Sequence, residues 1–304
     1  MIYINGEKFE VKHFPDNTQM LLNIDVNTVL KCQVRGDTMF MVFNWVYESD
    51  EELITLMYLV KHFREIMPTV QARHMAYRLI MQYIPNARMD RTKANTEVFT
   101  LKYFCEFINS LNFDEVIVLD PHSNVSTAML NNLIVEDVSP YIKYAIDDIE
   151  GMGIDGGEKY GGTSIIYFPD EGAFKRYSDL EVFGNREKIY GKKVRDWATG
   201  KILGLEAFSE DGTKLSEGYL RDKVVLMIDD IISYGGTLAY SADLLKSYGA
   251  LAIYAYASHV ENSVLDEERG TFIKRLENGT VDELFTTPSL YTGNNPRITV
   301  INEL

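Results

Sequence analysis

Acidic side chains stand directly after several apolar runs that have the length of buried strands. Asp229 and Asp230 follow the run at 224–228, and Asp170 follows the run at 165–168. Unpaired buried charge is costly, so packing alone does not favour two adjacent carboxylates at the end of a buried strand. Two interpretations remain open from the spacing: the pair caps the following helix or faces solvent, or it accepts hydrogen bonds from a ligand.

The residues that follow the carboxylate pair favour the interpretation that the pair contacts a ligand. They read Ser233, Tyr234, Gly235, Gly236 and Thr237, and a predicted helix begins there. Small residues at the start of a helix expose backbone N–H groups, and the helix dipole attracts an anion to them. Carboxylates beside such a cradle can accept hydrogen bonds from sugar hydroxyls while the loop holds a phosphate. The pattern therefore indicates a ribose-phosphate site.

A further set of polar residues follows the apolar run at 116–119, where the chain reads Asp120, Pro121 and His122. In doubly wound α/β sheets, ligands bind beyond the carboxyl ends of the strands. A single histidine in this position is by itself more often a hydrogen-bonded structural residue than a metal ligand. Its chemistry therefore depends on what the rest of the chain places beside it.

Strands and helices alternate along the chain. Asn5-Gly6 is typical of a tight hairpin turn, and Ser49 with Glu52 is typical of a helix capping box. The expected strands are 79–84, 116–119, 165–168, 224–228 and 252–256, and helical spacing marks 53–63, 104–111 and 141–149. This alternation predicts an α/β fold with parallel sheets. We expect an N-terminal domain at 1–137 and a C-terminal domain at 138–294, with the tail 295–304 packing back on the first domain.

Composition excludes several classes of protein. The chain has 304 residues, 46% hydrophobic and 25% charged, with a formal net charge of −15. A general nucleic-acid binder needs excess positive charge, so we expect no nucleic-acid partner. Two cysteines cannot form a disulfide framework, and neither a signal peptide nor an apolar run long enough to span a bilayer is evident. We therefore expect a cytoplasmic, soluble protein without a membrane partner.

Several segments, taken in order, resemble motifs of the ribose-phosphate diphosphokinase (PRPP synthetase) family. VVLMIDDIISYGGTL at 224–238 is similar to the phosphoribosyl-diphosphate fingerprint that this family shares with type I phosphoribosyltransferases. IPNARMDR at 84–91 resembles the family's ATP-binding segment, and LDPHS at 119–123 resembles the end of its Asp-Leu-His block. FPDEGAFKR at 168–176 resembles its Ser-Pro-Asp-x-Gly-Gly block. The resemblance implies two phosphoribosyltransferase-like domains, each a largely parallel sheet flanked by helices.

The resemblance also implies a reaction and a set of roles. The β,γ-diphosphoryl group of Mg-ATP would pass to the 1-hydroxyl of ribose 5-phosphate, giving PRPP and AMP. Lys193 and Arg195 correspond to the catalytic pair of a flexible loop at 191–200, although the neighbouring Lys192 leaves the alignment open by a residue. Family members assemble into homodimers or larger homo-oligomers. The remaining matches are Phe14, Asp16, Arg88, Asp90 and His122 for ATP; His122 and Asp170 for Mg²⁺; and Asp229, Asp230, Ser233, Tyr234, Gly235, Gly236 and Thr237 for the ribose phosphate.

The chain departs from the family in its functional loops. The family usually reads Asp-Thr-x-Gly-Thr where this chain has SYGGT, so a tyrosine replaces a small hydroxyl residue. A tyrosine offers a stacking face, which motivates an alternative acceptor larger than ribose 5-phosphate, such as ADP-ribose. Its product, ADP-ribose 1-diphosphate, would serve NAD salvage. On the ATP side, Met89, Thr18 and Lys93 replace the family's usual residues, which leaves the base specificity open.

Two further functions stay open. A non-catalytic regulatory homologue would bind nucleotide without turning it over, and the changes at Thr18 and Met89 motivate that alternative. A phosphoribosyltransferase would use the same fingerprint to consume the diphosphate, but it leaves the ATP-like segment of the first half unexplained. The absence of a Walker A motif argues against a P-loop kinase.

Overall fold

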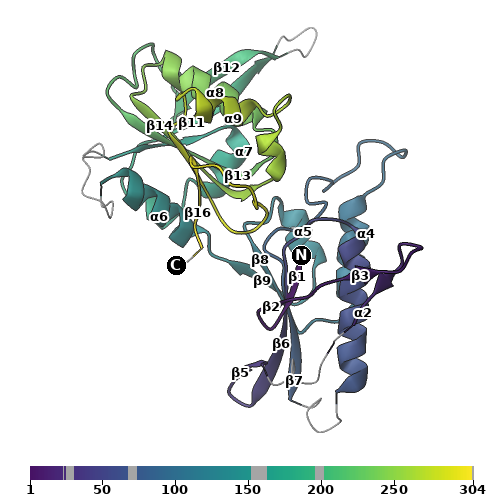
Figure 1. Ribbon diagram of the computed structural model, residues 1–304. Coiled ribbons are helices and arrows are strands. Elements are labelled where there is room, and N and C mark those ends of the chain that lie inside the picture. The colour runs from purple at the N-terminus through teal and green to yellow at the C-terminus, as the bar shows by residue number, and fades with distance from the viewer. Residues whose placement is uncertain (23, 25–30, 68–73, 152–162, 196–201, 303–304) are drawn as a thin grey trace. The chain divides into compact units, whose positions relative to one another are not determined.

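The computed structural model describes residues 1–22, 24, 31–67, 74–151, 163–195 and 202–302. The chain divides into two compact units, Met1–Asp137 and Val138–Leu304. Each unit has its own sheet and its own hydrophobic core (Figure 1). The two units are described separately below.

The first unit is built on a seven-stranded sheet with the order β2-β1-β6-β7-β8-β9, and β5 pairs with β6 outside this path. Strands β6 to β9 run parallel, whereas β1, β2 and β5 add antiparallel edges. The strands are β1 Ile2–Ile4, β2 Glu7–Lys8, β5 Gln33–Arg35, β6 Thr38–Trp45, β7 Met75–Ile80, β8 Glu115–Leu119 and β9 Leu133–Glu136.

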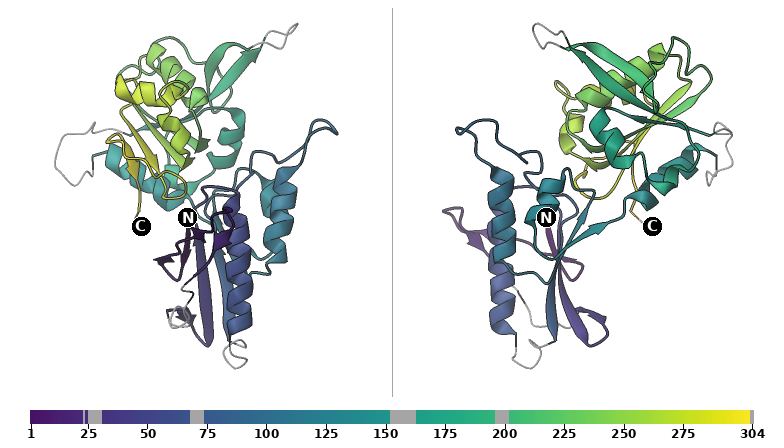
Figure 2. Two further views of the ribbon diagram at one scale, coloured as in Figure 1. Left: turned by 45° about the vertical axis from the view of Figure 1, so that its right-hand side comes forward. Right: turned by 180° about the vertical axis from the view of Figure 1, so that it is seen from behind.

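The helices α2 (Glu51–Ile66) and α4 (Thr100–Ser110) lie on the same face of the first sheet (Figures 1 and 2). Both helices bury apolar residues at helical spacing against alternate residues of β6, β7 and β8. The short helix α5 (Asn124–Met129) follows β8. A small hairpin, β3 (Lys12–His13) and β4 (Gln19–Met20), packs on the start of α2.

The second unit has a seven-stranded sheet with the order β12-β11-β10-β13-β14-β15-β16. All neighbouring pairs are parallel except β11 and β12, which form an antiparallel ribbon. The long strands β13 and β14, which are largely buried, lie side by side near its centre. The strands are β10 Ile165–Phe168, β11 Lys188–Arg195, β12 Ile202–Ser209, β13 Val224–Ile232, β14 Ala252–Val260, β15 Glu283–Thr286 and β16 Ile298–Val300.

Helices cover both faces of the second sheet (Figure 2). On one face, α8 (Gly236–Ser247) and α9 (Thr271–Glu277) pack on the main core. On the other, α6 (Ser139–Ile149) and α7 (Glu171–Tyr177) approach the sheet, and the 3₁₀ turns η1 (Glu181–Phe183) and η2 (Asn262–Leu265) complete the unit. Both units therefore confirm the predicted α/β class with largely parallel sheets and flanking helices.

Most predicted elements lie near the observed ones, and the exceptions have physical causes. The strand expected at 79–84 is wrong by four residues, because β7 ends at Ile80 and the apolar residues after it are buried in a loop. Strand β13 continues to Ile232, so Asp229 and Asp230 lie within the strand. The expected flexible loop at 191–200 is also wrong for its first part, because residues up to Arg195 belong to β11; residues 196–200 lie outside the described part.

The C-terminal tail differs from its prediction as well. Residues Ile298–Val300 form β16, which pairs in parallel register with β15 of the second unit. Edge pairing satisfies backbone groups that would otherwise be exposed, and it holds this part of the tail in the second unit. The expectation that the tail packs back on the first domain is therefore wrong for these residues.

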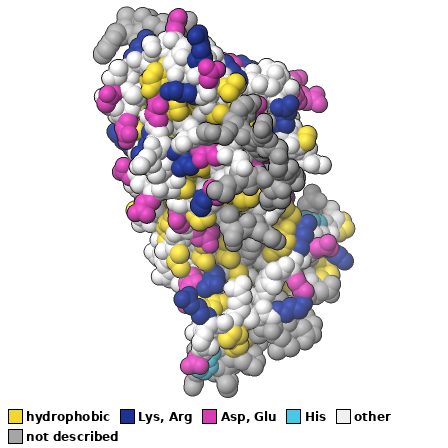
Figure 3. Space-filling view, turned by 90° about the vertical axis from the view of Figure 1, so that its left-hand side faces the viewer, with side chains coloured by type: hydrophobic (Ala, Val, Ile, Leu, Met, Phe, Trp, Pro, Cys, Tyr) yellow, Lys and Arg dark blue, Asp and Glu magenta, His cyan; other side chains and the backbone are white. Residues whose placement is uncertain are grey.

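The surface carries charges of both signs. On the face drawn in Figure 3, the described acidic and basic side chains are interspersed and do not gather into a basic patch. Among the described residues, no helix combines the length and the apolar character that a membrane span requires.

Candidate functional site

The carboxylate pair lies at the carboxyl end of the central strand of the second unit. The Asp230 backbone N–H donates a hydrogen bond to Asp229 Oδ1 at 3.0 Å. Asp230 accepts a hydrogen bond from Arg176 Nη1 at 3.1 Å, on the face that α7 covers. Burial and the neighbouring Asp230 carboxylate raise the pKa of Asp229 well above its usual value. The two carboxylates therefore have different electrostatic environments.

The predicted phosphate loop joins β13 to α8. Gly235 has a φ of +75°, and a Cβ there would lie 2.3 Å from Phe272 Cβ. Only glycine fits this conformation and this space. The carbonyl of Tyr234 accepts hydrogen bonds from the Thr271 N–H at 2.9 Å and the Thr271 hydroxyl at 2.9 Å. The loop is thus fixed by its contacts with α9, and the start of α8 presents backbone N–H groups as an anion cradle requires.

The side chains of Ser233 and Tyr234, the first residues of the loop, also make contacts within the protein. Ser233 Oγ lies 3.1 Å from Ser263 Oγ, so its hydroxyl bonds within the protein. The Arg269 guanidinium lies 4.5 Å from the centre of the Tyr234 ring and covers one face of it. The Tyr234 ring therefore forms a cation–π contact with Arg269 beside the loop, an arrangement that the sequence pattern did not predict.

Strand β11 distinguishes the two adjacent lysines. Lys192 Nζ pairs with Glu171 Oε1 of α7 at 3.1 Å. Lys193, one residue on, lines a half-open cleft of about 740 Å³ together with Gly236 and Thr237 of α8. The alternation of side chains along a strand sends the two lysines to opposite faces. The cleft therefore brings the predicted catalytic lysine to the predicted phosphate loop.

The same cleft extends over apolar residues. Its remaining lining residues are Gly204 and Leu205 of β12 and Tyr240 and Leu244 of α8. Tyr240 is 69% exposed, so its ring is accessible in the cleft. The backbone of Arg195 continues β11 beside β12, and its side chain lies outside the described part of the structure.

Asp170, a predicted magnesium ligand, caps a helix. Its Oδ1 accepts hydrogen bonds from the backbone N–H groups of Gly172 at 2.9 Å and Ala173 at 3.0 Å. Within the described residues, Oδ2 accepts no hydrogen bond and remains available to a cation. Mg²⁺ usually takes one or two carboxylates and completes its shell with water and substrate phosphates. Among the described residues there is no group of three acidic, histidine or cysteine side chains that could hold a metal.

Arg176 is a site residue that the sequence reasoning missed. It stands in the segment 168–176 that was compared with the family block, but only Asp170 was assigned a role there. Arg176 lies near the end of the short helix that Asp170 caps. Its pairing with Asp230 depends on the docking of α7 on β13, which the sequence does not reveal.

The predicted nucleotide residues belong to the first unit. Asp120, at the end of β8, has a buried side chain and a φ of +42°, a strained conformation of the kind found at functional sites. His122 follows it and precedes α5, while Arg88 is exposed in the loop after β7. Both loops extend from the carboxyl ends of neighbouring parallel strands, where such sheets bind ligands.

Two other nucleotide candidates lie on the β3–β4 hairpin. Phe14 is 48% exposed at its turn. Asp16 Oδ1 accepts hydrogen bonds from Thr18 N at 3.0 Å and Thr18 Oγ1 at 2.7 Å, which lowers the pKa of Asp16. Asp16 thus shapes the turn that presents Phe14. Asp90 lies 3.8 Å from Arg91 in the loop after β7.

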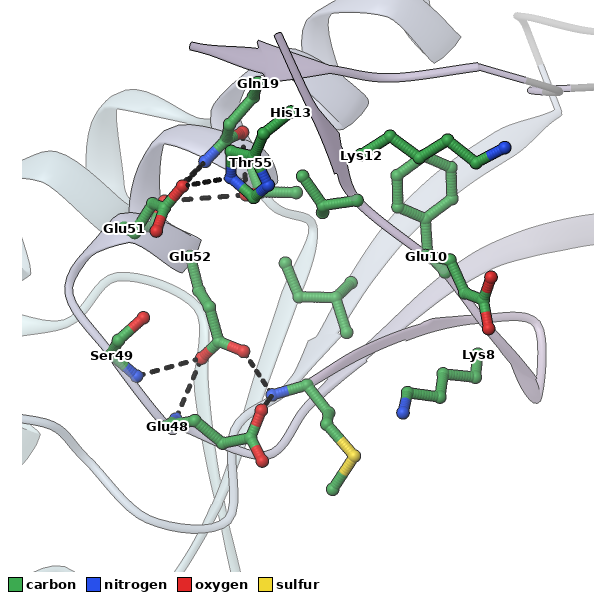
Figure 4. Close-up of a pocket in the computed structure, with 14 residues that line it drawn as sticks. Lys8, Glu10, Lys12, His13, Gln19, Glu48, Ser49, Glu51, Glu52 and Thr55 are labelled. Atoms are coloured by element: carbon green, nitrogen blue, oxygen red, sulfur yellow. Dashed lines mark hydrogen bonds and ion pairs between the residues drawn. The ribbon is translucent and has the colours of Figure 1, made fainter. Parts of the chain in front are cut away.

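The first unit also has a pocket of about 360 Å³ between this hairpin and the start of α2 (Figure 4). Its polar groups pair with one another: His13 Nε2 lies 2.7 Å from Glu51, and Glu52 accepts from the backbone N–H of Glu48 at 2.8 Å. None of the predicted nucleotide residues lines it. We therefore assign this pocket no part in the candidate site.

Comparisons with known proteins agree with this architecture. The phosphoribosyl transferase domain family matches residues 173–284. The chain is 26% identical to a ribose-phosphate pyrophosphokinase of Hyphomonas neptunium over 92% of this chain and 78% of that protein. It is also 26% identical to a ribose-phosphate pyrophosphokinase of Saccharolobus solfataricus, over 83% of this chain and 76% of the relative.

The fold has a counterpart among solved structures. The crystal structure of phosphoribosylpyrophosphate synthetase from Mycobacterium smegmatis matches with a TM-score of 0.69 and 15% sequence identity. The match covers 97% of this chain and 85% of that one, so both units take part in it. This likeness shows the fold, and the sequence matches along nearly the whole chain support a divergent relationship to the ribose-phosphate pyrophosphokinases.

Proposed function

We propose that the protein transfers the β,γ-diphosphoryl group of Mg-ATP to the 1-hydroxyl of ribose 5-phosphate. The 1-oxygen attacks the β-phosphorus, the bond between that phosphorus and the α,β-bridging oxygen breaks, and AMP leaves with the bonding electrons. The hydroxyl proton passes to solvent. The products are PRPP and AMP.

The observation that carries this proposal is the cleft that Lys193 of β11 and Thr237 of α8 both line. The first N–H groups of α8 would hold the 5-phosphate of the acceptor. The carboxylates of Asp229 and Asp230, at the end of the adjoining strand, would accept hydrogen bonds from ribose hydroxyls. Lys193 would then stabilise the negative charge of the diphosphoryl group during its transfer. Electrostatic stabilisation of this kind, together with positioning, provides most of the catalysis in phosphoryl transfer.

The nucleotide is assigned to the first unit. Arg88 and His122 stand on loops that leave the carboxyl ends of β7 and β8, and Phe14, Asp16 and Asp90 are the further candidates for contacts to ATP. Magnesium bound to the ATP phosphates would supply charge neutralisation, and Asp170 Oδ2 is a carboxylate oxygen suited to it. We also propose that the protein acts as a homodimer or larger homo-oligomer in the cytoplasm.

A second acceptor is favoured by a specific feature of the same cleft. Beyond the phosphate loop the cleft continues along Leu205, Tyr240 and Leu244. Ribose 5-phosphate has no apolar group that could contact these side chains. Beside the phosphate loop, the Arg269 guanidinium over Tyr234 would contact a second phosphate in exchange for its exposed ion pair with Asp266. An acceptor such as ADP-ribose would use both features and would give ADP-ribose 1-diphosphate for NAD salvage.

Release of AMP from ATP and Mg²⁺ tests both acceptors in one assay. Acceptor-dependent AMP with ribose 5-phosphate supports the first proposal, and a higher kcat/KM with ADP-ribose supports the second. If AMP is released neither with ribose 5-phosphate nor with ADP-ribose, a regulatory homologue is favoured. A requirement for PRPP and a free nucleobase would favour a phosphoribosyltransferase.

The adjacent lysines supply a matched pair of variants for the same assay. Lys193→Ala is expected to lower kcat by at least ~100-fold with little change in KM, because its contact forms mainly in the transition state. Lys192→Ala removes only the ion pair with Glu171 and is expected to keep kcat within about threefold. Equal losses in the two variants would contradict the role of Lys193.

A further inference from the structure

Helix α7 connects three parts of the second unit that the proposed reaction uses. Asp170 caps its first turn, Glu171 pairs with Lys192 of β11, and Arg176 pairs with Asp230 of β13. The first two contacts fix the helix at its beginning. The third reaches from its last turn to the carboxylate that is proposed to receive the sugar.

The contact between Arg176 and Asp230 is well enclosed. The distance from Arg176 Nη1 to Asp230 Oδ2 is 3.1 Å, and the side chains are 29% and 11% exposed. A carboxylate at this depth is costly unless a cation or hydrogen-bond donors compensate its charge. A guanidinium suits this purpose because it is always charged and keeps its donors in a rigid plane.

Asp229 is less suited than Asp230 to act as an ionised hydrogen-bond acceptor. Burial and the adjacent carboxylate raise the pKa of Asp229, so its charged form is disfavoured. Its Oδ1 accepts a hydrogen bond from the Asp230 backbone N–H at 3.0 Å, whereas Asp230 Oδ2 accepts from Arg176. The ionised partner of a sugar hydroxyl is therefore best supplied by Asp230, whose negative charge Arg176 compensates.

The packing of α7 holds the guanidinium in place. Phe174 packs between two aromatic rings: its centroid lies 4.9 Å from that of Tyr190, with the rings tilted, and 5.6 Å from that of Phe168, edge to face. Tyr177 lies parallel to Phe168 at 6.4 Å, and the Arg176 guanidinium lies 5.7 Å from the Tyr177 ring. Groups presented from a packed helix keep their geometry better than groups on a loop.

We propose that Arg176 is a positioning residue for the acceptor sugar: it holds the Asp230 carboxylate in the orientation that accepts hydrogen bonds from the ribose hydroxyls. This inference rests on the proposed function of the second unit.

The test compares three arginine variants in the AMP-release assay. Arg176→Ala is expected to raise the KM of the acceptor at least ~10-fold while the KM of ATP stays within about twofold, and Arg176→Lys is expected to recover part of the acceptor affinity. Arg275→Ala is the matched control, since Arg275 pairs with Asp243 at 2.6 Å with 27% of its side chain exposed. It is expected to keep all parameters within about twofold.

A double-mutant cycle makes the mechanism specific. If Arg176 acts through Asp230, Arg176→Ala changes the acceptor KM by less than about twofold in an Asp230→Asn background. Multiplicative effects, or equal increases in the KM of ATP and of the acceptor, would overturn the inference. If Arg176→Ala fails to fold, Arg176→Lys alone carries the cycle.

Binding separates failure of this inference from failure of the proposed function. Calorimetric titration with ribose 5-phosphate and with ADP-ribose measures acceptor affinity without turnover. A wild-type protein that binds an acceptor but releases no AMP would refute the proposed reaction and leave the role of Arg176 testable by affinity. A wild-type protein that binds neither acceptor would refute both, and unchanged acceptor affinity in Arg176→Ala would refute the inference alone.

Discussion

Gly235→Ala tests whether the phosphate loop depends on one residue without a side chain. The φ of +75° at Gly235 is unfavourable for alanine by roughly 1–2 kcal/mol. The added Cβ would also lie 2.3 Å from Phe272 Cβ and 3.3 Å from Ile232 Cγ2. Overpacking of this kind costs about 1–3 kcal/mol. We therefore expect a loss of about 2–5 kcal/mol in the free energy of unfolding of the second unit.

Gly279 provides a control with nearly the same backbone conformation. Its φ is +74°, and a Cβ there would meet nothing within 4 Å. Gly279→Ala should therefore show only the backbone cost of about 1–2 kcal/mol. Urea unfolding of the full-length variants, followed by circular dichroism, measures both losses, and the transition that Gly279→Ala shifts identifies the second unit. If Gly235→Ala destabilises no more than Gly279→Ala, the contact with Phe272 does not constrain the loop as described.

Three further outcomes follow from the second unit. Glu150 accepts hydrogen bonds from Arg186 Nε at 2.9 Å and Ser164 N at 2.8 Å. Burial acts to raise the pKa of Glu150, but the hydrogen bonds and the charge of Arg186 outweigh burial and lower the pKa below the usual 4.5. This contribution to stability is present above about pH 4.5 and is lost as the pH falls through the lowered pKa, so Glu150→Gln should cost about 1–3 kcal/mol at pH 7 and flatten the acid limb of a pH–stability curve; a parallel acid limb in the variant would contradict this. Tyr167→Phe removes the buried hydrogen bond to Ser241 Oγ at 3.1 Å and should cost about 1–2 kcal/mol in urea unfolding, and an unchanged midpoint would show that the bond is not formed. Chelation of Mg²⁺ by EDTA should abolish acceptor-dependent AMP release while leaving the thermal unfolding midpoint unchanged, since the metal is expected to enter with the nucleotide; a lower midpoint would indicate a resident ion.

The sequence predicted elements best where one local signal dominated. The Asn5-Gly6 turn joins β1 to β2 with positive φ at both residues, as its residue types require. Ser49 and Glu52 gave half of the expected cap: Glu52 accepts from the Ser49 N–H at 3.4 Å, but helix α2 begins after Asp50 and has no side-chain cap hydrogen bond. The short apolar run at 79–84 was misplaced because buried loops and buried strands have the same composition.

The candidate site also has features that the sequence predicted and features that only the fold reveals. The order of its motifs along the chain indicated the family, the carboxylate pair and the glycine turn, because these are local features of the backbone and of residue type. The sequence left Lys192 and Lys193 equivalent. Strand alternation in β11 separates them, sending one to Glu171 and the other to the cleft with Thr237.

By itself, then, the sequence determined what depends on near neighbours along the chain: strand and helix periodicity, the turn at Gly235 and the chemical types available for a ribose phosphate and a nucleotide. The tertiary structure decided which of these side chains meet. Arg176 pairs with Asp230 across 54 positions of sequence, and Lys193 and Thr237 line one cleft because β11 and α8 border it. Such contacts depend on how helices dock on a sheet, and docking is set by the packing of many side chains together.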